Sequence, residues 1–114
     1  ASNGVDFKLQ EAGALSDLNK AIALKPQNAY LYYCRANLYA HQGNNEKAVA
    51  DYTSAIKLDN RFAEAYFNRG LTYITLDNRS LGVKDLSKAG ELGLYSAYNI
   101  IKKNSASATK KQSK

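Results

Sequence analysis

Apolar residues recur along this chain with the spacing of helices that bury one face. Tyr32, Ala36 and Tyr39 stand at i, i+4 and i+7, which places their side chains on one side of a helix. A second stripe with the same period runs from Ala48 to Ile56, and the turn-forming sequence Gly43-Asn44-Asn45 separates the two. The pattern therefore predicts two antiparallel helices joined by a short turn.

The helical pair repeats after 34 residues, which is visible when the sequence is shifted against itself. Identical residues then coincide at Ala29/Ala63, Tyr32/Tyr66, Arg35/Arg69, Tyr39/Tyr73, Asn44/Asn78, Val49/Val83, Asp51/Asp85, Ala55/Ala89 and Leu58/Leu92. The same shift brings Ala14, Asp17, Ala21, Ile22 and Leu24 onto Ala48, Asp51, Ala55, Ile56 and Leu58. The 34-residue periodicity thus extends from residue 14 to residue 92. Each 34-residue period is expected to be one structural unit.

These periods predict helices at about residues 29–42, 45–58, 63–76 and 79–92. An earlier helix is expected from Phe7 to Leu24, with Asp6 as a possible N-cap and with its end set by Pro26. A further helix is expected from Tyr95 to about Lys103, and residues 105–114 are expected to be a disordered tail because they lack an apolar face. Gly82 and Gly90 interrupt a helix, so a neighbouring helix is expected to pack closely there.

The 34-residue unit resembles the tetratricopeptide repeat (TPR) family, whose pattern of small and aromatic residues recurs at fixed positions. The first unit supplies Tyr32, Ala36, Tyr39, Ala48, Tyr52 and Ala55, and the second supplies Tyr66, Gly70, Tyr73, Gly82, Leu86 and Ala89. The half unit before them supplies Ala14, Leu18, Ala21 and Pro26. Asn60 and Leu94 depart from the family's proline, and Gly82 departs from its alanine. Residues 91–98 also look like the closing segment of some bacterial members.

The resemblance covers about residues 5–103 and implies an all-α fold, a TPR-like right-handed α-solenoid of antiparallel helix pairs. Its expected parts are a half repeat at about 5–28, full repeats at 29–62 and 63–96, and a C-terminal capping helix at about 95–103. Together these parts form an array over residues 1–104, followed by the basic tail at 105–114.

In this family the first helix of each unit lines a concave groove, which implies a set of peptide-binding positions here. They are Tyr30, Tyr33, Cys34, Asn37 and His41 in the first unit, Glu64, Phe67, Asn68, Leu71 and Thr75 in the second, and Tyr98, Ile101 and Lys102 beyond it. Tyrosine and phenylalanine offer contact area at low entropic cost, and asparagine can pair with a peptide backbone. The alternative is that the asparagines are common family residues and only meet solvent.

Chaperone-binding members grip a terminal carboxylate with three cationic and two asparagine side chains, and the match here is partial. Asn37 and Asn68 occupy the two asparagine positions, and Lys102 stands where the family has arginine. Tyr33 and Tyr98 replace the two lysines. The sequence therefore favours a protein or peptide partner of unknown identity over this specific carboxylate clamp.

The chain has a formal charge of +6, which would suit a polyanionic partner if the charge lay on the folded part. Five of its lysines fall between Lys102 and Lys114, with no acidic residue among them. Residues 1–101 then hold 11 basic and 10 acidic groups, a charge of +1. Nucleic-acid binding is therefore not expected, since a few tail lysines give only weak, salt-sensitive binding.

Catalysis is not expected from these residues. Cys34 and His41 lie seven residues apart on one predicted helix, roughly 10 Å along its axis, which is too far for a nucleophile and its base. No phosphate loop, metal-ligand cluster or cofactor motif occurs, so we expect no enzyme activity, metal or cofactor. Asp51 and Asp85 recur at one repeat position, which indicates a structural role on the helix surface.

Neither a membrane span nor a signal peptide is recognisable, so a cytoplasmic location is expected. A removed signal peptide and a longer parent array stay open, because the chain does not begin with Met. The first helix has no partner helix of its own repeat, and Leu15 and Leu18 are expected to be exposed there. Self-assembly into a homo-oligomer through this helix is therefore the alternative to a peptide groove.

Overall fold

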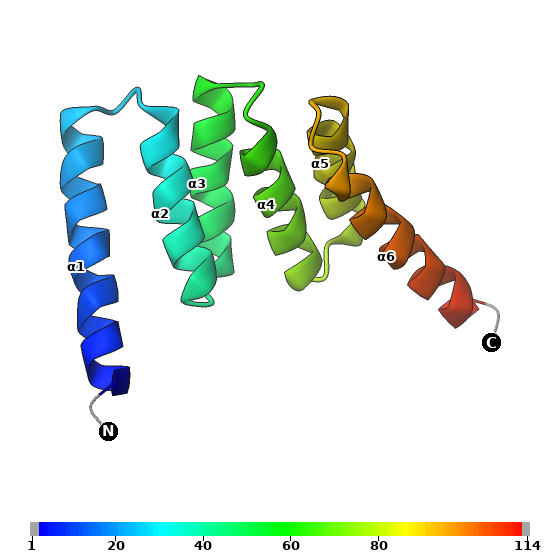
Figure 1. The fold of residues 1–114 in the computed structure, drawn as a ribbon, viewed down its shortest axis with the longest axis horizontal. Helices are drawn as coiled ribbons and strands as arrows, with labels where there is room; N and C mark the ends of the chain where they lie inside the picture. Colours follow the sequence, from blue (N-terminus) through cyan, green and yellow to red (C-terminus); the bar gives the residue numbers. More distant parts are fainter. Residues whose placement is uncertain (1–2, 113–114) are drawn as a thin grey trace. The chain divides into compact units, whose positions relative to one another are not determined.

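The computed structural model describes the backbone of residues 3–112 and the side chains of residues 7–104. This part of the chain forms helices joined by short turns and contains no strand (Figure 1). The helices are α1 (Asn3–Leu24), α2 (Ala29–His41), α3 (Asn45–Leu58), α4 (Ala63–Thr75), α5 (Arg79–Glu91) and α6 (Ser96–Gln112). The all-α class is therefore confirmed.

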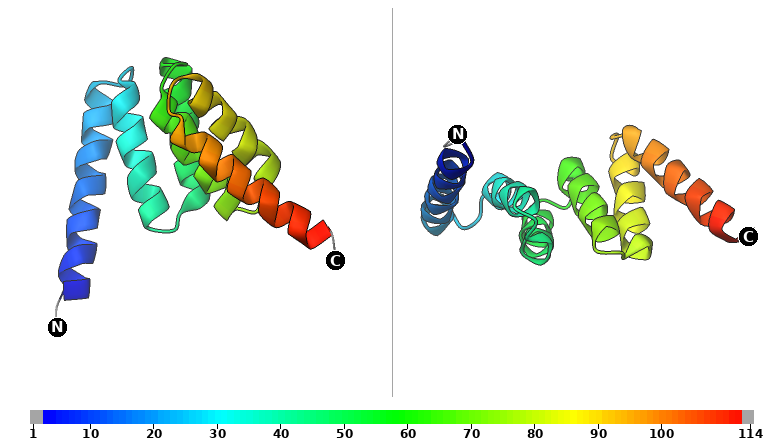
Figure 2. Two further views of the ribbon diagram at one scale, coloured as in Figure 1. Left: turned by 45° about the vertical axis from the view of Figure 1, so that its right-hand side comes forward. Right: turned by 90° about the horizontal axis from the view of Figure 1, so that it is seen from below.

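The chain divides into two compact units, the first ending at Asn60 and the second beginning at Arg61. In the first unit α2 and α3 lie antiparallel and in contact, and α1 lies beside α2 (Figure 2). In the second unit α4 and α5 form the equivalent antiparallel pair, and α6 packs against α5. Two antiparallel helix pairs and a final helix on the last of them are the elements of the TPR-like fold expected from the sequence.

The helix ends follow from the turn residues. Gly43 adopts a φ of 79° after α2, and this left-handed residue lets Asn44 N–H donate to the Tyr39 carbonyl at 2.8 Å. Asp77 takes the same place after α4 with a φ of 63°, a conformation that costs a non-glycine residue strain energy. Both α2 and α4 therefore stop one residue before the ends expected from the sequence.

Helix α1 is longer than the sequence predicts at its N-terminal end. It begins at Asn3, so Asp6 lies inside the helix and the expectation that it caps the helix is wrong. The positions one repeat before the turns at Gly43 and Asp77 hold Leu9 and no turn former, and the helix continues through them. Leu15 and Leu18, expected to be exposed, are half-buried.

Helix α6 continues to Gln112, past the end expected near residue 103. Residues 105–112 contain alanine and lysine, both good helix formers, and neither glycine nor proline to stop the helix. The described backbone is helical as far as Gln112, which differs from the disordered tail expected at 105–114. The last two residues of that segment lie outside the described part. An apolar face is needed to anchor a helix to a core, but helix propensity alone decides whether the backbone can continue.

A buried ion pair joins the two helices of the first pair. Arg35 on α2 donates to both carboxylate oxygens of Asp51 on α3, with Nε–Oδ2 at 2.7 Å and Nη2–Oδ1 at 2.8 Å. The guanidinium lies 5.8 Å from the ring centroid of Tyr32 and 6.0 Å from that of Tyr39. The hydrogen bonds to Asp51 raise the pKa of Arg35 above its ordinary value. The charged side chain thus fills the space between two tyrosines and fixes how α2 meets α3.

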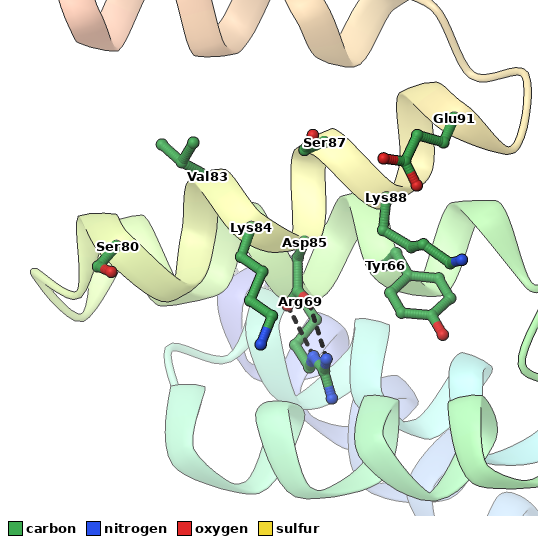
Figure 3. Close-up of a pocket in the computed structure, with 9 residues that line it drawn as sticks. All are labelled: Tyr66, Arg69, Ser80, Val83, Lys84, Asp85, Ser87, Lys88 and Glu91. Carbon is green, nitrogen blue, oxygen red and sulfur yellow. Dashed lines mark hydrogen bonds and ion pairs between the residues drawn. The ribbon is translucent and has the colours of Figure 1, made fainter.

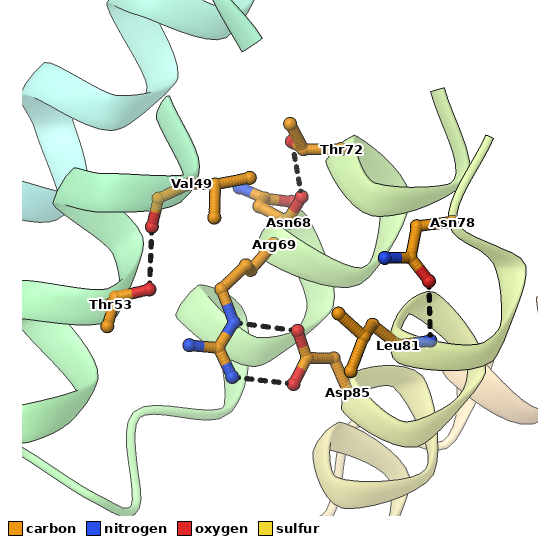
Figure 4. Close-up of polar contacts among 8 residues, drawn as sticks. All are labelled: Val49, Thr53, Asn68, Arg69, Thr72, Asn78, Leu81 and Asp85. Atoms are coloured by element: carbon orange, nitrogen blue, oxygen red, sulfur yellow. Dashed lines mark hydrogen bonds and ion pairs between the residues drawn. The ribbon is translucent and has the colours of Figure 1, made fainter. Parts of the chain in front are cut away.

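The second helix pair contains the same arrangement one repeat later. Arg69 donates to both oxygens of Asp85 at 2.7 Å (Figure 4). Its guanidinium lies beside the rings of Tyr66 and Tyr73. Only 6% of Asp51 and 5% of Asp85 is exposed. The expectation that these carboxylates lie on the helix surface is therefore wrong, because each carboxylate is buried in the helix interface by its ion pair with an arginine. Their role is structural, as expected.

Close packing of the second pair requires two glycines. A Cβ atom added at Gly70 would lie 2.9 Å from the carbonyl oxygen of Gly82, and one added at Gly82 would lie 2.8 Å from that of Gly70. The first pair holds Ala36 and Ala48 at the equivalent positions, both fully buried. The close approach expected around Gly82 is confirmed, and α4 and α5 approach each other too closely for an alanine.

We predict that Asp85→Ala lowers the free energy of unfolding by about 3–5 kcal/mol, because it leaves the half-buried Arg69 guanidinium without its carboxylate. Urea denaturation followed by circular dichroism measures this. Glu91→Ala, at an exposed position near the end of the same helix, is the control and should change stability by less than about 0.5 kcal/mol. Equal stability of the two variants would contradict the assigned role of the ion pair.

We also predict that Gly70→Ala destabilises the protein by about 1–3 kcal/mol, since backbone atoms cannot move aside for the added methyl group. Gly13→Ala is the matched control, because a Cβ atom there meets nothing within 4 Å. At that exposed helical position alanine should stabilise the protein by up to about 1 kcal/mol. Thermal unfolding of both variants compares the two; a stabilising Gly70→Ala would rule out the close contact.

Candidate peptide-binding surface

The residues expected to bind a peptide in the first unit lie along one face of α2. Tyr30, Tyr33, Asn37 and His41 are spaced by three, four and four residues, which keeps them on one side of the helix. The helix begins where the Asn28 side chain accepts hydrogen bonds from the N–H groups of Tyr30, at 3.0 Å, and of Leu31. This cap fixes the first turn, from which Tyr30 projects.

Three tyrosine rings connect this surface to the core. Tyr30 is 62% exposed, its ring centroid lies 6.0 Å from that of Tyr33, and the Tyr33 ring lies 6.0 Å from that of Tyr52. Tyr52 belongs to α3 and is only 2% exposed. The Tyr30 ring therefore presents apolar area to solvent on a base of packed aromatic rings.

The hydroxyl of Tyr52 donates a hydrogen bond to the side-chain carbonyl oxygen of Asn37. This bond fixes which end of the Asn37 amide points toward α3. In the second unit the equivalent residues are Leu86 and Leu71, and the hydrogen-bonded pair is replaced by an apolar contact. The fold thus sets the orientation of the Asn37 amide, which spacing along α2 does not indicate because Tyr52 belongs to another helix.

Cys34 lies one turn after Tyr30 and is half-buried. Its hydrogen-bonded side chain is the main cause that raises the pKa of Tyr30 above its ordinary value, and the neighbouring Tyr33 adds to the effect. The Tyr30 hydroxyl therefore keeps its proton throughout the physiological pH range and presents a neutral phenol.

His41 marks the C-terminal end of this face and contacts α1. Its Nε2 atom lies 3.5 Å from Oε1 of Glu11, and its ring meets that of Phe7 edge-on at 5.6 Å. The three side chains border an open hollow of about 600 Å³ between α1 and α2. Phe7 and Glu11 were not among the expected site residues, since no helical pattern within α1 indicates which part of it meets α2.

The second unit divides its expected site residues between surface and core. Glu64 and Lys102 are exposed, and Asn68 is half-buried, with its backbone carbonyl accepting from the Thr72 hydroxyl at 2.8 Å (Figure 4). Phe67 and Leu71 are half-buried and pack against the core formed by Leu86, Ala89 and Ala97. Phe67 and Leu71 therefore pack under the surface rather than forming it, because α5 and α6 supply apolar contacts for them. The sequence pattern did not indicate these contacts.

The C-terminal residues expected in the groove divide in the same way. Ile101 packs against the Leu86 cluster, whereas the Tyr98 ring lies over Gly90 and keeps 45% of its area exposed. A Cβ atom at Gly90 would lie 2.5 Å from that ring, so the absence of a side chain at Gly90 makes room for the tyrosine. Thr75 is exposed at the end of α4, and its hydroxyl donates to the Leu71 carbonyl.

The second unit has a hollow of about 640 Å³ between α4 and α5 (Figure 3). Tyr66, Arg69 and Asp85 line it together with α5 side chains, and none of the expected site residues does. In the first unit the equivalent face of α2 is the one that α1 contacts, through Arg35 Nη1 and Asn19 Oδ1 at 2.9 Å. This hollow therefore corresponds to a helix-packing face of the repeat.

Within the part of the chain that the structure describes, no three His, Cys, Asp or Glu side chains are grouped so that they could hold a metal ion. No helix among the described residues is both long enough and apolar enough to cross a membrane.

Three family models match the chain: a TPR repeat model over residues 36–77 and two tetratricopeptide repeat models over residues 18–50 and 63–92. A Protein SGT1 homolog from Oryza sativa subsp. japonica is 40% identical over 72 residues, which is 63% of this chain and 18% of that protein. The chain spans 5%, 18% and 15% of the three curated relatives it matches.

Solved structures give the same assignment of the fold. The first TPR of Spaghetti (RPAP3) is 24% identical, with a TM-score of 0.82 over 95% of this chain and 87% of that chain. MamA is 30% identical, with a TM-score of 0.72 over 83% of this chain and 56% of that chain. The fold expected from the sequence is therefore confirmed by independent structures.

We predict that Tyr52→Phe lowers the free energy of unfolding by about 1 kcal/mol, because it removes the hydroxyl that orients the Asn37 amide. Tyr30→Phe removes a hydroxyl from an exposed ring and should leave stability unchanged within about 0.5 kcal/mol. Paired urea titrations of the two variants and the parent protein measure both. If Tyr52→Phe were as stable as the parent, the hydrogen bond would have no part in building the surface.

Proposed function

Because the chain belongs to the tetratricopeptide repeat family, we propose that it is a non-catalytic protein-interaction module that presents a groove to a peptide or partner protein. In the first unit the proposed binding face comprises Tyr30, Tyr33, Asn37 and His41 on α2. In the second unit the proposed binding residues are Glu64 and Asn68 on α4 and Lys102 on α6. Phe67 and Leu71 support them from the core. The observation that carries the proposal is the exposed Tyr30 ring on its base of packed tyrosines, beside an amide whose orientation is fixed.

The α2 face suits an extended peptide for two reasons. The exposed ring of Tyr30 offers apolar area to a ligand side chain, and two rotatable bonds limit the entropy lost on binding. The Asn37 amide is held by Tyr52, so no reorientation cost reduces its binding to a peptide group. A preorganised aromatic surface beside an amide is the arrangement expected for main-chain and apolar side-chain recognition together.

The chemistry of this face also predicts which peptide it should not prefer. The solved structure of the first TPR of Spaghetti (RPAP3) has the domain bound to the HSP90 peptide SRMEEVD. This peptide is acidic toward its C-terminal end. Here the α2 face carries tyrosines and a histidine but no lysine or arginine, and Lys102 is the cation among the proposed residues. An acidic peptide would therefore find too little positive charge to offset its desolvation.

We predict that SRMEEVD binds to this chain at least about 100-fold more weakly than peptides selected from a displayed random library. The difference of about 2.7 kcal/mol corresponds to one or two charge-assisted hydrogen bonds that Tyr33 cannot supply. Fluorescence anisotropy with labelled peptides measures both affinities. Tight binding of SRMEEVD would contradict this prediction and favour the carboxylate clamp of the chaperone-binding members.

The selected peptides also locate the site. Tyr30→Ala should weaken their binding about tenfold or more, because an exposed aromatic anchor is lost while the fold keeps its core. Lys57→Ala, at an exposed position on α3, is the control and should leave affinity unchanged. Peptides that bind Tyr30→Ala and Lys102→Ala as tightly as the parent protein would place the binding site elsewhere.

Self-assembly is a second candidate function, and one observation favours it. The face of α1 that carries Ala14 and Asp17 is exposed, whereas the equivalent faces of α3 and α5 are buried. A helix with an exposed packing face can bind another helix. A second copy of this chain could supply that helix.

A further inference from the structure

Helix α1 carries half of the arrangement that joins each helix pair. Asp17 stands one repeat before Asp51 and two repeats before Asp85, the carboxylates that bind arginine in the buried ion pairs. Those two carboxylates are buried, whereas Asp17 is exposed. Ala14 is likewise exposed, whereas Ala48, one repeat later, is fully buried. The surface through which α3 meets α2 is therefore open on α1.

Helix α6 carries the other half. Lys103 stands one repeat after Arg69 and two repeats after Arg35, at the position whose cation enters the ion pair. Its side chain is exposed, whereas those arginines are mostly buried between tyrosines. Ile100 stands one repeat after Tyr66, and both side chains pack against the Leu86 cluster. A large hydrophobic residue thus precedes the cation by three positions, where both complete pairs have a tyrosine. The position through which Arg69 of α4 meets α5 is therefore open on α6, at Lys103.

We propose that α6 of one copy of the chain packs antiparallel on α1 of a second copy, with Lys103 against Asp17. The new helix pair would then repeat the arrangement of α2 with α3 and of α4 with α5. This proposal names the partner and the contact for the self-assembly candidate, and it does not rest on peptide binding to the α2 face.

Charge supports this partner over other helices. From Ser96 to Gln112, α6 has four lysines and no acidic residue, whereas α1 has three acidic residues and two lysines. The interface is expected to be weaker than the internal pairs. Lysine cannot make the bidentate contact that arginine makes, and Asn104 stands where the closely packed Ala36 and Gly70 stand in α2 and α4. Each copy joins two others by different surfaces, so assemblies grow head to tail.

Analytical ultracentrifugation across a concentration series tests the proposal. The parent chain should show a mass that rises with concentration beyond that of a monomer. Asp17→Lys and Lys103→Asp should each raise the apparent dissociation constant at least about tenfold, because each places like charges at the contact. Both substitutions fall on exposed residues, so circular dichroism should show an unchanged helix content.

Mixing the two single variants provides the decisive measurement. In the mixture every contact between unlike copies again joins opposite charges, so association should return to near the parent level, and the double variant should behave in the same way. Lys57→Asp is the control for a general charge effect and should leave association unchanged. A chain that stays monomeric at every concentration, or a mixture that fails to recover association, would overturn the proposal.

Discussion

An arginine–aspartate pair shielded by two tyrosines organises each helix pair of this protein. Removing both charges from water has a large free-energy cost, which only the bidentate geometry and the ring faces offset. The net free-energy cost rises sharply if α2 slides or rotates against α3, because the hydrogen bonds are then lost while the charges stay buried. Arg35 therefore acts with Ala36 to set one arrangement of the two helices, and Arg69 does the same with Gly70.

The surface available for binding follows from this constraint. Since Tyr32, Arg35 and Tyr39 face inward, the helical period turns Tyr30, Asn37 and His41 to the opposite side of α2. Tyr33 lies between the two sides and reaches Tyr52, which links the exposed ring to the core. The residue pair Asn37–Tyr52 is polar and its counterpart Leu71–Leu86 is apolar, so the two units build chemically different faces on one backbone plan.

Several features of the site could be derived from the sequence, and others could not. The helical period places Tyr30, Tyr33, Asn37 and His41 on one face, because side-chain direction along a helix depends only on spacing. The burial of Phe67 and Leu71 depends on α5 and α6, which approach from distant parts of the chain. The contact of His41 with Phe7 and Glu11 depends on α1 continuing through a position where the other units turn.

The sequence by itself determined the repeat, the helix pairs and the small residues between them, because these arise from local spacing and from side-chain size. The repeat placed Arg69 one period after Arg35 and Asp85 one period after Asp51. From spacing alone, however, the two carboxylates were expected on the helix surface. Only the tertiary structure paired them, because whether a charge is buried depends on which opposite charge another helix brings within hydrogen-bonding distance. Spacing along one helix fixes direction, whereas the partner met in that direction is decided by how the helices pack.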